Sequence, residues 1–173
     1  MTVIAIGLGV SIIAGEIEHR TLEVAYTVPG GARRIWMAKM VAIILLLVLT
    51  EGLLAITTVT FFTGFPLASL YGAFPGAVFY LVLAMGLGAL FKSEITAVLV
   101  ALVLLVANGV LSGFGDASSR LSPLFNPLAV RNTSASEILT WTVQNRIGVA
   151  LAIIALAVLA FARAEHREKL LGS

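Results

Sequence analysis

The chain alternates long apolar runs with short polar breaks, and the runs have the length of membrane-spanning helices. A helix needs roughly 20 apolar residues to cross the hydrocarbon core of a bilayer. The sequence predicts such spans at 37–63, 74–91, 95–114 and 146–162. A shorter apolar run at 1–14 would extend for only about 20 Å as a helix, against a core of about 30 Å. The pattern therefore predicts an all-α integral membrane protein, a single transmembrane domain with one half-span and four full spans.

The composition agrees with a membrane environment. The 173 residues are 60% hydrophobic and 12% charged, whereas soluble domains carry about 25% charged residues. Cysteine is absent, so the chain has no disulfide or thiolate chemistry. The net charge is only +2, and no basic surface interleaved with aromatic residues indicates nucleic-acid binding. Lipid is the expected surrounding of most of the chain.

Two polar regions interrupt the apolar pattern. The first, 15–36, opens with alternating charge, breaks at Pro29-Gly30-Gly31 and closes with basic and aromatic residues. It predicts a short amphipathic helix at Glu16–Tyr26, a turn, and a return to the membrane. The second region, 115–145, carries apolar residues at helical spacing and proline breaks, which favours short helices at the other surface.

The basic residues predict an orientation. If 15–36 is cytoplasmic and the four spans alternate from there, 8 of the 11 Lys and Arg residues lie on the cytoplasmic side. Cytoplasmic connections carry an excess of Lys and Arg in membrane proteins. The region 115–145 would then be outside, and the C-terminal tail inside.

The first polar region also resembles the coupling segment of the ABC-2 type transporter permease family. The matching residues are Glu16, Glu18, Thr21, Leu22, Glu23, Pro29, Arg33 and Lys39. The resemblance continues at Ser122–Pro127 before the last span and at Arg167–Leu171 in the tail. It covers most of the chain in the right order.

The resemblance implies a fold and a set of partners. In that family the segment is a cytoplasmic coupling helix that docks on an ATPase subunit, and short outer helices form a re-entrant hairpin. The implied ATPase-binding residues are Glu16, Glu18, Arg20, Thr21, Leu22, Glu23, Tyr26 and Pro29. The run 1–14 would correspond to the family's second helix, so the first would be missing, through a shortened subunit or a downstream start. The alternative interpretation of 15–36 is an ordinary surface helix whose charges are solvated.

The implied function is that of the membrane permease subunit of an ATP-driven exporter in the cell membrane. It would pair with a second permease subunit, as a homodimer or a heterodimer, and with a separate ATPase subunit. The chain has no phosphate-binding loop, so it is not expected to be an enzyme, and ATP and magnesium would bind to the partner. The alternative function is that of a structural or assembly protein of the membrane. The sequence does not specify a transported substrate.

Glu51 and Asn108 are polar residues inside predicted spans. Glu51 lies near the membrane middle, where an ionisable group costs a few kcal/mol unless it is paired or hydrated. One interpretation is that Glu51 faces a transport pathway or carries a proton. The other is that its carboxyl is hydrogen-bonded by a Thr or Asn of a neighbouring helix, for instance by Asn108.

Small residues at four-residue spacing occur at Gly109 and Gly113, late in the third span. Such spacing lets helices approach closely, either at a subunit interface or in internal packing. His19 and His166 are the only histidines, and they lie too far apart in the sequence to suggest a metal site.

Overall fold

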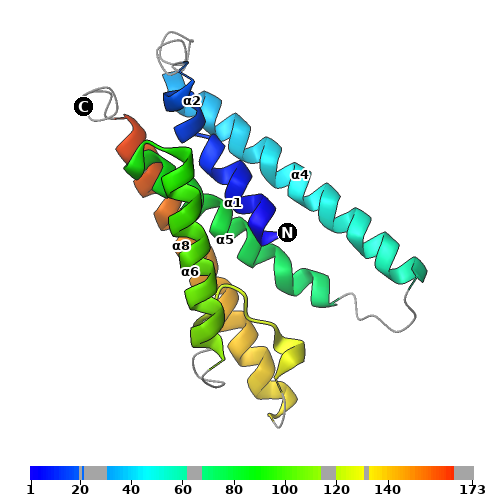
Figure 1. Cartoon of the computed structure of the whole chain (residues 1–173). Coiled ribbons are helices and arrows are strands. Elements are labelled where there is room, and N and C mark those ends of the chain that lie inside the picture. The colour runs from blue at the N-terminus through cyan, green and yellow to red at the C-terminus, as the bar shows by residue number, and fades with distance from the viewer. Residues whose placement is uncertain (20, 22–30, 62–67, 114–119, 131–132, 166–173) are drawn as a thin grey trace.

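The computed structural model describes residues 1–19, 21, 31–61, 68–113, 120–130 and 133–165 (Figure 1). Within these ranges the chain is helical apart from short connections. The elements are α1 (Thr2–Ser11), α2 (Ala14–Glu18), α4 (Gly31–Phe61), α5 (Ala68–Phe91), α6 (Glu94–Ser112), the short 3-10 helix η1 (Pro127–Ala129) and α8 (Ala135–Glu165).

Four of the helices, α4, α5, α6 and α8, are long and apolar enough to cross a membrane. This confirms the predicted all-helical membrane class, and the described residues contain four long apolar helices, as the sequence predicts. Large apolar side chains cover the outside of these helices, as expected where the surrounding solvent is hydrocarbon.

Helix α5 is the centre of the bundle. It packs against α1, α4, α6 and α8, and Figure 1 shows it running behind α1 and α8. Half of the most apolar stretch of α5 is buried, against 6% of the corresponding stretch of α4. The residues buried on α5 include Tyr80, Leu81 and Met85. The other helices therefore take their positions from contacts with α5.

Helix α1 is short, as the length of the first apolar run predicts. Its ten residues extend for about 15 Å, and it begins partway along α5 and runs toward α2 (Figure 1). Ile6 and Val10 are buried against α5 and α6. At Gly9 a Cβ atom would overlap the backbone carbonyl of Leu81. The absence of a side chain at this position is therefore what allows α1 to lie against α5.

Helix α8 begins earlier than the sequence pattern predicts. The span predicted to begin at Arg146 lies within a longer helix, which is continuous from Ala135. The reason is a capping box at its N-terminus. Ser134 Oγ accepts a hydrogen bond from the backbone N–H of Glu137, and the Glu137 carboxylate accepts hydrogen bonds from Ser134. This reciprocal arrangement satisfies N–H groups that otherwise lack intrahelical partners.

Helix α4 is the most exposed of the four. It spans 31 residues, or about 46 Å, and begins at Gly31 rather than at the predicted residue 37. Its buried residues are Ala32, Trp36 and Leu47, and no residue from Thr50 to Phe61 is buried. The second half of α4 therefore extends beyond the packed part of the bundle.

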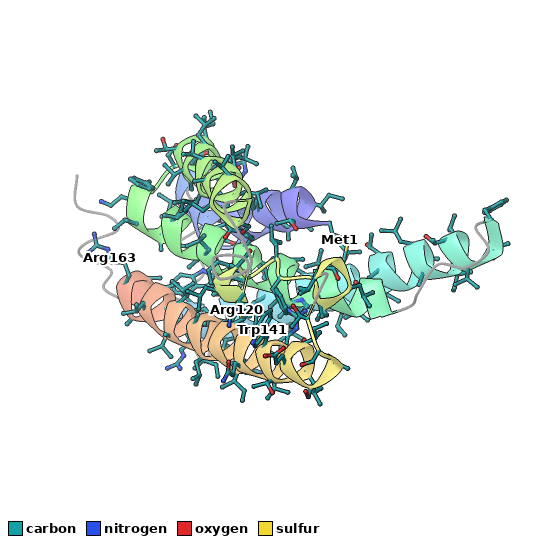
Figure 2. The ribbon with its side chains drawn as sticks, turned by 90° about the horizontal axis from the view of Figure 1, so that it is seen from below. Met1, Arg120, Trp141 and Arg163 are labelled. Carbon is teal, nitrogen blue, oxygen red and sulfur yellow. The ribbon has the colours of Figure 1, made fainter. Side chains whose placement is uncertain are left out.

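Different helices and connections lie at the two ends of the bundle. At one end lie α2, the start of α4, the turn between α5 and α6, and the end of α8 (Figure 1). At the other lie η1 and the start of α8, with Arg163 of α8 at the opposite end of that helix from Trp141 (Figure 2). This arrangement brings 31–39 and 92–94 to one end, as alternating spans require. The described part of 115–145 consists of residues 120–130 and the first turns of α8, so the re-entrant hairpin stays a prediction.

Candidate functional site

The first candidate site is a polar cluster around α2, which we call the α2 junction: Glu16, Glu18, Thr21, Lys39 and Glu94. Glu16 lies on α2 and forms an ion pair with Lys39 of α4, 23 residues further along the chain. Thr21 Oγ1 donates a second hydrogen bond to the Glu16 carboxylate. The Glu16 side chain is 12% exposed and that of Lys39 is 42% exposed. The ion pair joins α2 to the start of α4.

The ionisation of Glu16 reflects two opposing effects. Partial burial raises its pKa, because a charge is less stable away from water. The hydrogen bonds from Lys39 and Thr21, together with the positive charges of Lys39 and His19, act the other way and outweigh burial. The net result is a pKa below the ordinary value of 4.5, so Glu16 is ionised at neutral pH.

Glu18 joins α2 to a different helix. Its Oε1 accepts a hydrogen bond of 2.8 Å from the backbone N–H of Glu94, at the start of α6. The first N–H groups of a helix have no intrahelical partners, and a carboxylate there is favourable. Ser93, the residue at the N-cap of α6, makes no side-chain capping bond. Glu18 therefore supplies the cap from another helix.

The structure describes only part of the predicted ATPase-binding set. Glu16, Glu18 and Thr21 contact other parts of the same chain, so part of the charge pattern serves internal packing. Five residues of the set lie outside the described residues: Arg20, Leu22, Glu23, Tyr26 and Pro29. The described helix α2 ends at Glu18, and from residue 22 onward the predicted coupling helix lies outside the described residues. Docking of an ATPase stays a prediction.

The second candidate site lies at the opposite end and is built on an asparagine network of Asn108, Ser122 and Asn145. Asn145 of α8 is 7% exposed and Ser122 is 4% exposed. Asn145 Nδ2 donates to the carbonyl oxygens of Arg120 and Ser122, at 2.7 and 2.9 Å. Asn108 Nδ2 of α6 donates to Ser122 Oγ at 2.9 Å. The network ties segment 120–122 to both α6 and α8.

Arg146 extends this attachment to α5. Its guanidinium donates to the carbonyl oxygens of Phe125 and Gly72, at 3.2 and 3.4 Å. An arginine presents five donors in a fixed plane, so a single side chain can bind several carbonyls. Gly76 of α5 allows the same segment to approach, since a Cβ there would meet Leu124. The described segment 120–126 is thus held against α5, α6 and α8.

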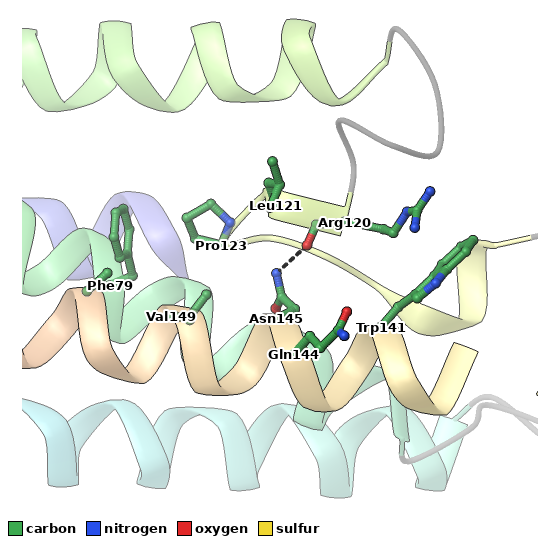
Figure 3. A pocket seen from close by; sticks show the side chains of 10 residues that line it. Phe79, Arg120, Leu121, Pro123, Trp141, Gln144, Asn145 and Val149 are labelled. Carbon is green, nitrogen blue, oxygen red and sulfur yellow. Dashed lines mark hydrogen bonds between the residues drawn. The ribbon is translucent and has the colours of Figure 1, made fainter. Parts of the chain in front are cut away.

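A cavity of about 650 Å³, which we call the α8 cleft, opens beside this network (Figure 3). Its walls come from α5, from segment 120–123 and from α8. The lining residues are Phe79, Arg120, Leu121, Pro123, Trp141, Gln144, Asn145, Gly148, Val149 and Ala152. The Arg120 guanidinium carbon lies 3.8 Å from the ring centroid of Trp141, a cation–π contact. The cleft combines one cationic end with apolar walls.

Glu51 lies on the side of α4 that faces the bundle. It is four residues beyond the buried Leu47, so the two share a helix face. Its Oε1 atom is buried and has no hydrogen-bond partner among the described residues. Asn108, suggested by the sequence as a partner for Glu51, instead binds Ser122. Glu51 Oε1 therefore has no hydrogen bond from Asn108 among the described residues, and both interpretations of Glu51 stay predictions.

Gly109 and Gly113 are exposed late in α6. A Cβ at Gly109 would meet nothing within 4 Å, and one at Gly113 would meet only carbonyls of its own helix. Among the described residues, no other helix packs closely against this pair. Their predicted location at a subunit interface stays a prediction.

Sequence reasoning missed the asparagine network and the Arg120–Trp141 contact. One signal was present, because Asn145 and Arg146 are polar residues directly before an apolar run. Polar side chains at membrane depth usually face the protein interior, where they find partners. The identity of the partners depends on the return path of segment 120–130, which no local pattern encodes.

No protein-family model matches the chain, and neither a curated protein nor a solved structure is significantly similar to it. The class of protein follows from the structure itself. With four helices long and apolar enough to cross a bilayer, the chain is a multi-pass membrane protein.

Proposed function

We propose that the protein is the membrane permease subunit of an ATP-driven exporter, acting with a second permease subunit and a separate ATPase. The observation that carries the proposal is the α2 junction. Charged residues at one end of the bundle connect a short helix to two long apolar helices, next to the segment that resembles the ABC-2 coupling helix. The basic residues Arg33, Arg34, Lys39 and Lys92 at this end agree with a cytoplasmic location.

The contacts of the junction suggest how movement would pass into the membrane. A displacement of α2 by a partner would act on α4 through the Glu16–Lys39 pair and on α6 through the Glu18–Glu94 hydrogen bond. Helices are stiff, so a shift at one end moves the whole element. Opening between the two permease subunits would follow from the relative movement of α4 and α6, with ATP bound and hydrolysed on the partner.

Purification of the chain from its native membrane in mild detergent tests the proposal. An ATP-hydrolysing protein is expected to co-purify, and Glu23→Lys is expected to weaken its retention. Asp116→Lys is the matched control, because it reverses an acidic residue of region 115–145, which is predicted to lie on the other side of the membrane. Absence of any nucleotide-hydrolysing partner would favour the structural or assembly role instead.

A second variant separates docking from transmission. Lys39→Met removes the ion pair with Glu16 but keeps an apolar side chain of similar length. The ATPase is expected to remain bound, while transport-stimulated ATP hydrolysis falls. Unchanged stimulation in a Lys39→Met complex would count against a transmitting role of the α2 junction.

A further inference from the structure

The α8 cleft has the size and the wall chemistry of a small-molecule binding site. Its volume of about 650 Å³ lies within the range of roughly 300 to 1,000 Å³ that ligand pockets occupy. It is lined along α8 from Trp141 to Ala152, a distance of about 16 Å at the rise of an α-helix. An elongated molecule with one alkyl chain fits these dimensions.

The cationic end of the cleft is Arg120. Asn145 fixes the backbone carbonyl of this residue (Figure 3), and Trp141 holds the guanidinium by a cation–π contact at 3.8 Å. A cation–π contact uses none of the five N–H donors of a guanidinium. The Nε atom is buried without a hydrogen-bond partner among the described residues. A positioned guanidinium with unused donors is suited to a carboxylate or a phosphate.

The other end of the cleft is apolar. Phe79, Val149 and Ala152 line it, and Gly148 widens it because a Cβ there would meet nothing within 4 Å. Among the described residues, no acidic side chain forms an ion pair with Arg120. Glu137, one turn before Trp141, is engaged by Ser134, and Arg146 adds a second positive charge next to Asn145.

We propose that the α8 cleft binds an amphipathic anion, with its phosphate or carboxylate group at Arg120 and its alkyl chain along α8 toward Ala152. This site is independent of the proposed ATPase coupling, because binding requires only this chain. The ligand reaches the cleft either from the surrounding bilayer, as a lipid with a phosphomonoester head group, or from water, as a single-chain amphiphile.

Binding of radiolabelled dodecyl phosphate to the full chain in phosphatidylcholine nanodiscs tests this inference. Saturable binding is expected. Dodecanol and inorganic phosphate are each expected to compete at least about tenfold more weakly, because dodecanol lacks the anionic group and inorganic phosphate lacks the alkyl chain. Phosphatidic acid built into the nanodisc distinguishes the two sources. It displaces dodecyl phosphate if the cleft takes up bilayer lipid, and it leaves binding unchanged if the ligand enters from water.

Two variants assign the binding to the cleft. Arg120→Gln removes the charge and is expected to weaken dodecyl phosphate binding about tenfold. Gly148→Leu fills the apolar end and is expected to abolish binding while leaving Arg120 in place. Arg163→Gln, at the far end of α8, and Gly52→Leu, at another glycine with open space around it, are the matched controls and should bind normally.

The proposal is overturned by either of two results. One is equal competition by dodecanol, which would indicate simple apolar partitioning. The other is wild-type affinity in Gly148→Leu, a variant that introduces no backbone clash and therefore is expected to fold even if Arg120→Gln does not.

Discussion

The carboxylate of Glu18 caps a helix that begins 76 residues later in the chain, by accepting a hydrogen bond from the backbone N–H of Glu94. This hydrogen bond connects α2 directly to the start of α6. It also gives a structural reason for an acidic residue in a segment whose charges otherwise suggest contact with another protein. Structural and partner-binding functions of this segment must therefore be separated residue by residue.

The cap predicts the effect of removing the carboxylate. Glu18→Ala is expected to destabilise the protein by about 1 kcal/mol, the usual cost of losing a helix cap. Glu18→Gln keeps an oxygen acceptor and is expected to lose less. Thermal unfolding in detergent, followed by helical circular dichroism, measures both. A Glu18→Ala protein that melts with the wild type would show that the hydrogen bond contributes nothing.

The Glu16–Lys39 pair predicts an acid-sensitive contribution to stability. Because the folded pKa of Glu16 lies below its ordinary value of 4.5, the folded state favours the ionised carboxylate. This contribution is complete above pH 4.5 and disappears as the pH falls through the folded pKa. We expect at most about 1 kcal/mol, because Lys39 is partly solvated.

Unfolding midpoints measured from pH 7 downward in wild type and Glu16→Gln test this contribution. The difference between the two proteins should shrink as the solution becomes acidic. A difference that is the same at every pH would contradict the assigned ion pair.

The two glycines of α1 predict opposite effects of one substitution. Gly9→Ala places a Cβ against the carbonyl of Leu81 and is expected to destabilise the protein by about 1–3 kcal/mol, as overpacking does. Gly7→Ala meets nothing within 4 Å and is expected to stabilise the helix by about 0.5–1 kcal/mol. Equal unfolding temperatures for the two variants would mean that α1 does not lie against α5 as described.

Membrane orientation is testable with single cysteines, since the chain has none. Arg34→Cys and Ser136→Cys change exposed residues at opposite ends of the bundle. With the cytoplasmic side assigned by basic residues, an impermeant maleimide applied to intact cells should label Ser136→Cys alone. Labelling of only Arg34→Cys would invert the orientation.

Substitution of Glu51 is expected to affect activity without lowering the stability of the fold. Glu51→Gln keeps the volume of the side chain and removes the charge, so expression and unfolding temperature should stay at or above the wild-type values. If the carboxyl lines a pathway or carries a proton, coupled ATP hydrolysis in the assembled complex should fall. Normal coupled hydrolysis in Glu51→Gln would remove the functional interpretation.

The sequence by itself determined the membrane class, the four long apolar helices and the short length of α1. Each of these follows from the number of consecutive apolar residues, because a bilayer has a fixed thickness. The start of α8 was also encoded locally, in the Ser134–Glu137 capping box, although apolar patterning alone placed it at Arg146.

Only the tertiary structure decided which residues meet across helices. Lys39 pairs with Glu16, Asn108 binds Ser122, and Gly9 lets α1 approach α5 closely. In a soluble protein an alternating apolar face marks the buried side of each helix. In a membrane both faces of a helix are apolar, because lipid is as apolar as the protein interior. The apolar pattern therefore does not distinguish the face that packs against other helices from the face that contacts lipid. The partners of each helix are fixed by side-chain shape and by the few polar groups that must find one another.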